Sequence, residues 1–224
     1  MSDQPTWSPP RHVVILAHPD PHSFNAAVAE AYCETVRACG QEAIVRDLYA
    51  MGFDPVLKDA ERPAKHAIVL SPDVSAELDA IRGADIYTLI YPIWFAMPPA
   101  MMKGYIDRVL GAGVTAQDIQ HHAGEGVLSR RHMLSITSSG AREIWLDEQA
   151  QVESLRNVFS RYLFHAFAMA SCEHLHLGGI VEGFSKRFID EDLRDVHERA
   201  RRVCAMLAAE RHGGLAPFSV ADGS

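Results

Sequence analysis

The chain has 224 residues, of which 48% are hydrophobic and 22% are charged, so it can bury a sizeable core and suits one domain. Its formal net charge of -8, with no cluster of Lys and Arg, argues against a surface that binds nucleic acid. No apolar run approaches the roughly 18 residues that a membrane-spanning helix needs, so membrane insertion is not expected.

The termini and the cysteines indicate a cellular location. The first ten residues are polar and proline-rich, without the apolar centre of a signal peptide. Four cysteines are scattered along the chain and form no CxxC pair: Cys33, Cys39, Cys172 and Cys204. Such spacing is typical of buried thiols in a reducing compartment, so we expect a cytoplasmic protein. We expect a disordered leader over residues 1–11, one domain over residues 12–212 and a flexible tail over residues 213–224.

The first half of the chain alternates between strand and helix patterns. In order, these are a strand at Val13–Ala17, a helix at about Phe24–Ala38, a strand at Glu42–Asp47, an irregular excursion at Leu48–Pro63 and a helix at Ser71–Gly83. Ser23 can cap the first helix, and Gly40 ends it.

The second half continues this alternation. In order, it has a strand at Ile86–Tyr91, a helix at about Ala100–Leu110, a loop-rich connection at Gly111–Arg131, a strand at His132–Thr137, a long helical pattern from Leu146 to about Ala170, a strand at His174–Leu177 and a helix at Asp190–Arg211. Five strands that alternate with helices predict an α/β protein with a parallel sheet between two helical layers, since right-handed crossovers place helices on both faces.

The stretch from Ile86 to Leu110 is the most informative part of the chain. Its strand gives way at Pro92 to a loop with two large aromatic residues, Trp94 and Phe95, and then to prolines suited to a first helical turn. Such a junction leaves amides facing outward at the carboxyl edge of a sheet, where open α/β folds bind ligands. We expect a flat, partly anionic ligand there. Alternatively, the two aromatic side chains only cover the sheet edge.

The loop after the first strand, HPDPHS, contains no glycine. The G-x-G-x-x-G pattern of dinucleotide-binding folds is therefore missing, which favours the flavodoxin-like arrangement. Anion binding is still expected, because Ser23, Asn25 and the free amides of the helix that begins there form a hydroxyl-rich cradle at a positive helix end.

Five motifs occur in order along the chain: LAHPDPHSFN at Leu16–Asn25, DLYAMGFDP at Asp47–Pro55, LSPD at Leu70–Asp73, YPIWFAMPPAMMKGYIDRVL at Tyr91–Leu110 and LSITSSG at Leu134–Gly140. Together they resemble the flavodoxin-like NAD(P)H:quinone reductase family, which includes DT-diaphorase, the modulator of drug activity B and the ancillary flavoprotein of a potassium efflux system. The resemblance covers about residues 12 to 180 and is most specific in the central motif. It implies a three-layer α/β/α fold with a five-stranded parallel sheet in the strand order 2-1-3-4-5.

The resemblance also implies a reaction. Members of the family bind FAD or FMN and transfer a hydride from NADPH or NADH to a quinone-like acceptor, in two half-reactions, as homodimers with the active sites at the subunit boundary. FAD is favoured over FMN, because the Ser23-Phe24-Asn25 block and the long excursion after Asp47 resemble those of the FAD-binding members.

Carried over residue by residue, the resemblance assigns three groups of cofactor-binding residues. The flavin phosphates would be held by His18, Ser23, Phe24 and Asn25. The isoalloxazine ring would be lined by Pro92, Ile93, Trp94 and Phe95. The polar edge of the ring would be contacted by Thr137, Ser138, Ser139 and Gly140. For His18 the alternative is a loop histidine that caps a nearby carbonyl.

Three departures from the family pattern affect the chemistry. Trp94 follows Ile93 directly, so which aromatic residue meets the ring is open, and the side chain of Ser139 stands where the family has glycine. Trp145 and Gln151 stand near the positions of a tyrosine and a histidine that shelter charge in DT-diaphorase. Trp145 is the catalytic candidate by position alone. Proton transfer would then fall to the flavin, to water, or to histidines at other positions: His121, His122 and His165.

Other interpretations remain. A regulatory flavoprotein that docks on a membrane transporter would share the fold and the flavin, and only turnover separates it from an enzyme. A metal cluster is conceivable from five residues: His121, His122, Glu125, His132 and Glu173. No metal site is expected, because adjacent histidines rarely reach one ion and no HExxH spacing exists.

Overall fold

Strand β3 is the centre of the sheet and is buried along its whole length. The computed structural model describes residues 8–62, 69–121, 126–141, 150–181, 183 and 185–211. One parallel sheet has the order β2-β1-β3-β4-β5 and consists of β1 (Arg11–Leu16), β2 (Glu42–Asp47), β3 (Ile86–Pro92), β4 (His132–Ser138) and β5 (Ser171–Leu177). The predicted α/β class and strand order are confirmed.

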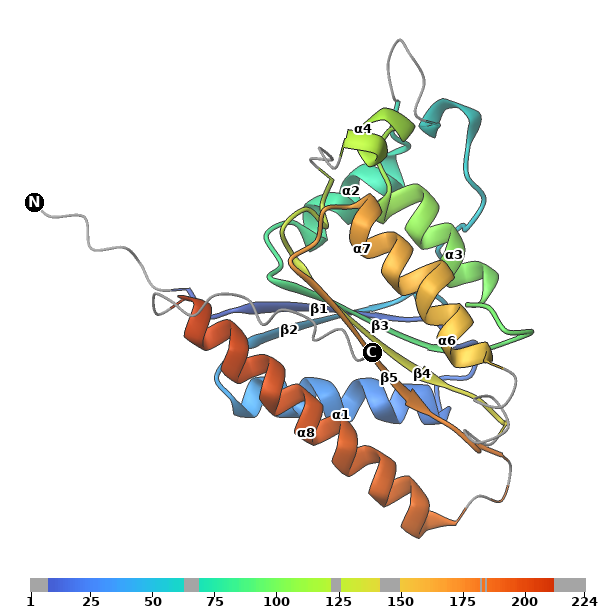
Figure 1. Ribbon diagram of the computed structural model, residues 1–224, viewed down its shortest axis with the longest axis vertical. Coiled ribbons are helices and arrows are strands. Elements are labelled where there is room, and N and C mark those ends of the chain that lie inside the picture. Colours follow the sequence, from blue (N-terminus) through green and yellow to red (C-terminus); the bar gives the residue numbers. More distant parts are fainter. Residues whose placement is uncertain are drawn as a thin grey trace, which may run out of the picture.

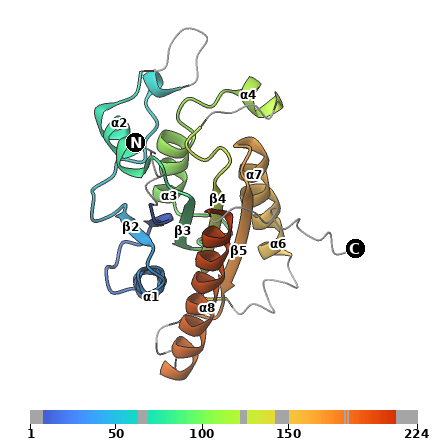
Figure 2. The same ribbon diagram turned by 90° about the vertical axis from the view of Figure 1, so that its left-hand side faces the viewer.

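Helices cover both faces of the sheet (Figures 1 and 2). One face carries α1 (Phe24–Ala38) and α8 (Lys186–Arg211). The other carries α2 (Pro72–Ile81), α3 (Ala100–Tyr105), which continues as a π-helical turn (Ile106–Leu110), and a helix that runs from α6 (Gln151–Leu155) through a π-helical segment (Arg156–Arg161) to α7 (Tyr162–Ala166). A short 3-10 turn (Asp59–Glu61) and α4 (Ala116–His121) complete the described elements. Every helix in the described ranges is too short or too polar to cross a membrane.

The core has two parts because side chains alternate between the faces of a strand. On β3, Tyr87 and Leu89 pack toward α2 and α3, whereas Ile86 and Ile90 pack toward α1 and α8. All four are at most 1% exposed, which explains the continuous apolar run in the sequence. The sheet is therefore rigid at the centre, and the loops at its carboxyl edge extend from fixed strand ends.

Several boundaries differ from the sequence-based expectations. β1 begins at Arg11 rather than Val13, and β5 begins at Ser171 rather than His174. β5 lies at the edge of the sheet and mixes polar with apolar residues, so its start carries no apolar pattern. The last helix begins at Lys186 rather than Asp190, and α4 lies within the connection expected to be loop. Residues 1–7, 212–224 and 142–149 lie outside the described residues, so the predicted leader, the tail and the start of the long helix are not described there.

The irregular segment that follows β2 is fixed to the π-helical turn by a buried arginine, Arg108. Both oxygens of Glu61 accept from Arg108, over 2.7 and 2.8 Å, and Asp73 accepts from the same guanidinium over 2.9 Å. The guanidinium lies 5.3 Å above the ring centre of Phe53. Arg108 and Glu61 are nearly inaccessible to water, so this ion pair adds to the apolar contacts that Leu48 and Phe53 of the same segment make with the core.

A glycine allows the same excursion to approach the helix layer closely. A Cβ atom on Gly104 of α3 would come within 2.3 Å of Pro55, against both its Cβ and its carbonyl oxygen. Gly104 is therefore required by packing, although glycine disfavours a helix interior.

Candidate active site

The loops that leave β1, β3 and β4 meet in a cavity of about 190 Å³ at the carboxyl edge of the sheet. The cavity is lined by His18, Phe24, Asn25, Pro92, Ile93, Trp94, Ser138, Ser139, Gly140 and Ile180. All of these except Ile180 are among the residues predicted from the sequence. The fold brings them together because parallel strands place their carboxyl ends at one edge.

His18 is held by its own loop. Nδ1 of His18 lies 3.1 Å from the Asp20 amide nitrogen and 3.2 Å from the Asp20 carbonyl oxygen. The ring lies 6.0 Å from that of Trp94, centre to centre. The contact with a nearby carbonyl, the alternative considered for His18, is thus present, and these contacts leave Nε2 for a ligand in the cavity.

The start of α1 supplies unpaired donors. Ser23 caps the helix, because its Oγ accepts from the Ala26 amide over 3.2 Å. Its hydroxyl is therefore engaged and lies outside the cavity lining. No backbone hydrogen bond in the described part of the chain takes the amides of Phe24 and Asn25. Those two N–H groups, at the positive end of a helix of 15 residues, fit an anion such as a phosphate.

Asn25 links the two sides of the cavity through hydrogen bonds. Its Nδ2 donates to Ser138 Oγ over 2.9 Å, and Ser138 Oγ lies 3.1 Å from Asn25 Oδ1. Both residues are buried. The hydrogen bonds of the Asn25 side chain are therefore made with the end of β4. This side chain positions the start of α1 and is not expected to bind a ligand itself.

The aromatic loop after β3 forms a tight reverse turn. The amide of Trp94 donates to the Met97 carbonyl over 3.0 Å, and the Met97 amide donates back over 3.1 Å. Phe95 and Ala96, between them, have φ of 50° and 64°, in the left-handed region that favours glycine. Strain of this kind is concentrated at functional sites. Trp94 lines the cavity, while Phe95 points into solvent and is fully exposed.

The loop after β4 contributes hydroxyl and backbone groups. Ser139 Oγ donates to the Ala141 carbonyl over 3.0 Å and lies 3.1 Å from His176 Nε2, so its side chain is turned inward. Thr137 is fully buried and lies outside the cavity lining. Its Oγ1 bonds His174 and His176 instead, because alternation along β4 turns it to the opposite side from Ser138.

Several candidate residues lie elsewhere. Trp145, His122 and Glu125 lie outside the described residues, as does the side chain of Gln151. His132 lies at the amino end of β4, away from the cavity, where it contacts Ser171 and Glu210.

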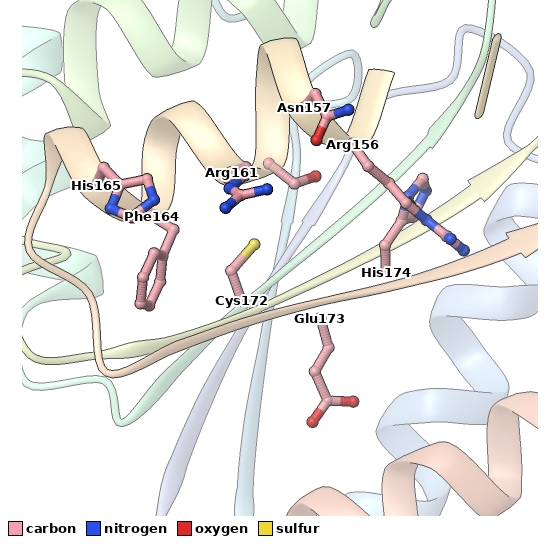
Figure 3. Close-up of a pocket in the computed structure, with 9 residues that line it drawn as sticks. Arg156, Asn157, Arg161, Phe164, His165, Cys172, Glu173 and His174 are labelled. Atoms are coloured by element: carbon pink, nitrogen blue, oxygen red, sulfur yellow. Dashed lines mark hydrogen bonds between the residues drawn. The ribbon is translucent and has the colours of Figure 1, made fainter. Parts of the chain in front are cut away.

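A second, larger cavity of about 480 Å³ lies between the α6–α7 helix and β5 (Figure 3). It is lined by Arg156, Arg161, Phe164, His165, Cys172 and His174, among others, while the Glu173 side chain points away toward α8, where it pairs with Arg199. No role is expected from the sequence for His174 or His176. Their alternate placement on a strand beside Thr137 was the signal that could have identified them.

The arrangement suits a flat ligand that carries an anionic group. Unpaired amides at the start of α1 fit the anion, Trp94 offers an aromatic surface, and the Ser138–Gly140 loop borders the cavity with polar groups. Fixed donors of this kind stabilise charge without reorganising.

Comparisons with known proteins agree with this geometry. The family described as flavodoxin-like fold matches residues 10–200. An uncharacterised NAD(P)H oxidoreductase of Haemophilus influenzae is 29% identical over 201 residues, which cover 89% of this chain and 93% of that protein. NAD(P)H dehydrogenase (quinone) 1 of Cavia porcellus is 34% identical over 153 residues, covering 60% of this chain and 55% of that protein. This chain thus matches about half the length of the Cavia protein.

Solved structures agree as well. The NAD(P)H:quinone oxidoreductase from Methanothermobacter marburgensis has a TM-score of 0.74 and 27% identity, covering 88% of this chain and 96% of that one. An FMN-dependent NADH-azoreductase from Bacillus anthracis, solved with FMN, has a TM-score of 0.61 at 18% identity, covering 87% and 99%, a likeness that shows the fold alone. The chain therefore belongs to the flavodoxin-like family that includes the NAD(P)H:quinone reductases.

Proposed function

We propose that the protein is a flavin-dependent NAD(P)H:quinone oxidoreductase. The observation that carries this proposal is the convergence of three loops, after β1, β3 and β4, on one cavity that combines an aromatic surface with unpaired helix amides. The relatives from Haemophilus influenzae and Cavia porcellus, named as an NAD(P)H oxidoreductase and a quinone dehydrogenase, support the same reaction class.

The residues of the cavity fit a flavin. The amides of Phe24 and Asn25, with His18 Nε2 beside them, would hold the phosphate at the start of α1. Trp94 and Ile93 would line the ring, and the loop of Ser139 and Gly140 would face its polar edge. When bound, a flavin accepts a hydride from NAD(P)H and passes it to an acceptor. The chain orients the ring and offers polar groups where charge develops.

The roles of the remaining predicted residues differ. Asn25 and Ser138 fix the two walls of the cavity, and Ser23 fixes the helix end. Ser139, whose side chain is turned toward His176, leaves its backbone beside the space where the nicotinamide and the quinone would enter in turn. Phe95 and Thr137 do not line the cavity, so we assign neither to the ring.

We further propose FAD as the flavin, with FMN as the alternative, and a homodimer in a reducing, cytoplasmic compartment. The Ser23-Phe24-Asn25 block supports FAD, while an FMN complex is known for the Bacillus anthracis azoreductase. The exposed side chains of Trp94, Phe95 and Met97 form an apolar group on the loop after β3 that a second subunit would cover. All four cysteines are free, which is consistent with a reducing compartment.

The test is to purify the protein, release its chromophore by heat and identify it by mass, and then to assay NADH and NADPH oxidation with menadione. We expect a flavin and turnover of menadione. A protein that takes up no flavin, and stays inactive when flavin is supplied, would contradict the proposal. A protein that binds flavin without turnover would instead favour the regulatory alternative.

A further inference from the structure

A line of hydrogen-bonded side chains crosses the carboxyl halves of β4 and β5. His174 Nε2 lies 2.7 Å from Thr137 Oγ1, and the same oxygen lies 2.9 Å from His176 Nδ1. His176 Nε2 in turn lies 3.1 Å from Ser139 Oγ. Thr137 pairs with His176 in the sheet register, so the side chains of His174, Thr137 and His176 lie on the same face of the sheet.

The outer end of the line fixes the direction of its first bond. Arg156 Nε lies 3.4 Å from His174 Nδ1, and a guanidinium can only donate, so His174 Nδ1 accepts and its Nε2 carries the proton. His174 therefore donates to Thr137.

The direction then passes inward. Because the Ser139 hydroxyl donates its only proton to the Ala141 carbonyl, it accepts from His176 Nε2, and His176 Nδ1 therefore accepts from Thr137. The Ser139 hydroxyl donates to the Ala141 carbonyl over 3.0 Å. Every donor in the line thus points from His174 toward Ser139.

The two ends of the line open into different cavities. Ser139 lines the 190 Å³ cavity of the candidate active site, and His174 lines the 480 Å³ cavity between the α6–α7 helix and β5. Figure 3 shows the Arg156 side chain extended across His174 at that outer end. Between the ends, Thr137 is fully buried and His176 is 8% exposed, so solvent does not replace the bonds.

We propose that this line, from His174 through Thr137 and His176 to Ser139, delivers the proton that each turnover takes from solvent. The proposal rests on the proposed function. NADH gives a hydride, which carries two electrons and one hydrogen, and a quinone needs that hydride and one proton to become a hydroquinone. The sum is NADH, one proton and quinone on one side, and NAD⁺ and hydroquinone on the other.

Each member of the line breaks one bond to hydrogen and forms another. The long, exposed contact from Arg156 opens, and His174 takes a proton from water at Nδ1. It releases the proton at Nε2 to Thr137, which passes its own to His176 Nδ1. His176 releases its Nε2 proton to Ser139, whose side chain then rotates from the Ala141 carbonyl toward the cavity and gives its proton to the reduced acceptor. Rotation of the hydroxyls and tautomer exchange of the rings restore the starting arrangement.

The environment of His174 keeps this ring neutral at rest. Burial lowers the pKa of His174 to about 3, and the charge of Arg156 acts in the same direction. A proton arriving at this ring is therefore not trapped there.

The first test is structural and needs no turnover. Nitrogen-15 NMR of the imidazoles in the flavin-free protein should show His174 and His176 as neutral Nε2–H tautomers at neutral pH. An Nδ1–H tautomer of either ring, or an imidazolium at His174, would overturn the proposal.

The second test separates the half-reactions by stopped flow. Oxidation of NADH takes no proton from solvent, whereas reduction of menadione takes one. Thr137→Val should slow the menadione half-reaction by roughly 10²-fold and leave the NADH half-reaction and flavin affinity unchanged, the size expected for lost proton transfer. Thr137→Ser keeps a hydroxyl and should recover most of the rate.

A matched control is Thr88→Val, since Thr88 is equally buried in β3 but lies on the face toward α1 and α8. It should leave both half-reactions unchanged. If Thr137→Val behaves like Thr88→Val, the relay is wrong although the proposed function stands. If the wild-type protein itself fails to reduce menadione, the proposed function is wrong, and the relay with it.

Discussion

Asn25 Nδ2 donates to Ser138 Oγ over 2.9 Å and so joins the first turn of α1 to the end of β4, 113 residues away in the sequence. Both residues line the cavity of the candidate active site. Their bond means that the helix amides and the loop after β4 keep a fixed spacing before any ligand arrives.

The first prediction concerns the coupling between these two residues. Asn25→Ala and Ser138→Ala should each destabilise the protein by about 1–3 kcal/mol, because each leaves a buried polar partner unpaired. In a double-mutant cycle by urea unfolding, the pair should show a coupling energy of at least about 0.5 kcal/mol. Additive losses would mean that the two side chains act independently.

The second prediction separates the two aromatic residues of the turn. Trp94→Ala should weaken flavin binding by about 0.5–1.5 kcal/mol, the value of an aromatic contact, because Trp94 lines the cavity. Phe95→Ala is the matched control and should leave flavin affinity of the isolated subunit unchanged, because Phe95 is fully exposed. Fluorescence titration with flavin measures both. A larger loss for Phe95→Ala would place the ring against the other side of the turn.

The third prediction concerns acid stability. A hydrogen bond from Arg108 holds the pKa of Glu61 at about 2, below its usual 4.5. Since the folded pKa is depressed, the ion pair stabilises the protein above about pH 4.5, and this stability is lost as pH falls toward 2. The loss attributable to Glu61 is on the order of 3 kcal/mol.

Urea unfolding between pH 7 and pH 3 tests this, with Glu61→Gln as the comparison. The variant should be less stable than the wild type at pH 7 and should lose less stability as the solution is acidified. Parallel pH profiles for the two proteins would show that Glu61 is not depressed in the folded state.

The fourth prediction concerns the packing of the excursion. Gly104→Ala should cost about 1–3 kcal/mol, because its Cβ would overlap Pro55 backbone that cannot move without shifting the segment. Gly40→Ala is a useful comparison, since its space is open and only its φ of 73° opposes a side chain. That second change should cost about 1–2 kcal/mol through the backbone alone. A Gly104→Ala protein of wild-type stability would refute the close contact.

The sequence predicted the sheet and most of the cavity because these depend on short, local patterns. The apolar run of β3 is continuous since both faces are covered, and parallel strands place their following loops at one edge whatever the helices are. His18, Trp94 and Ser139 therefore come together from loops far apart in the sequence.

The sequence could not determine which way individual side chains point. Thr137 and Ser138 are adjacent, and only the register of β4 decides that Ser138 faces Asn25 while Thr137 faces His174. The turn at Phe95 was also unpredictable, because neither Phe95 nor Ala96 is a residue that favours positive φ. His174 and His176 on β5 were not identified, because an edge strand with alternating polar residues resembles a solvated one.

The most direct measurement is a crystal structure of the protein loaded with flavin. The ring should lie against Trp94 and Ile93, with a phosphate at the amides of Phe24 and Asn25 and the polar edge of the ring at the Ser139–Gly140 loop. A flavin bound instead in the larger cavity beside Arg156 and Arg161, or one that makes no contact with the three converging loops, would contradict this assignment of the active site.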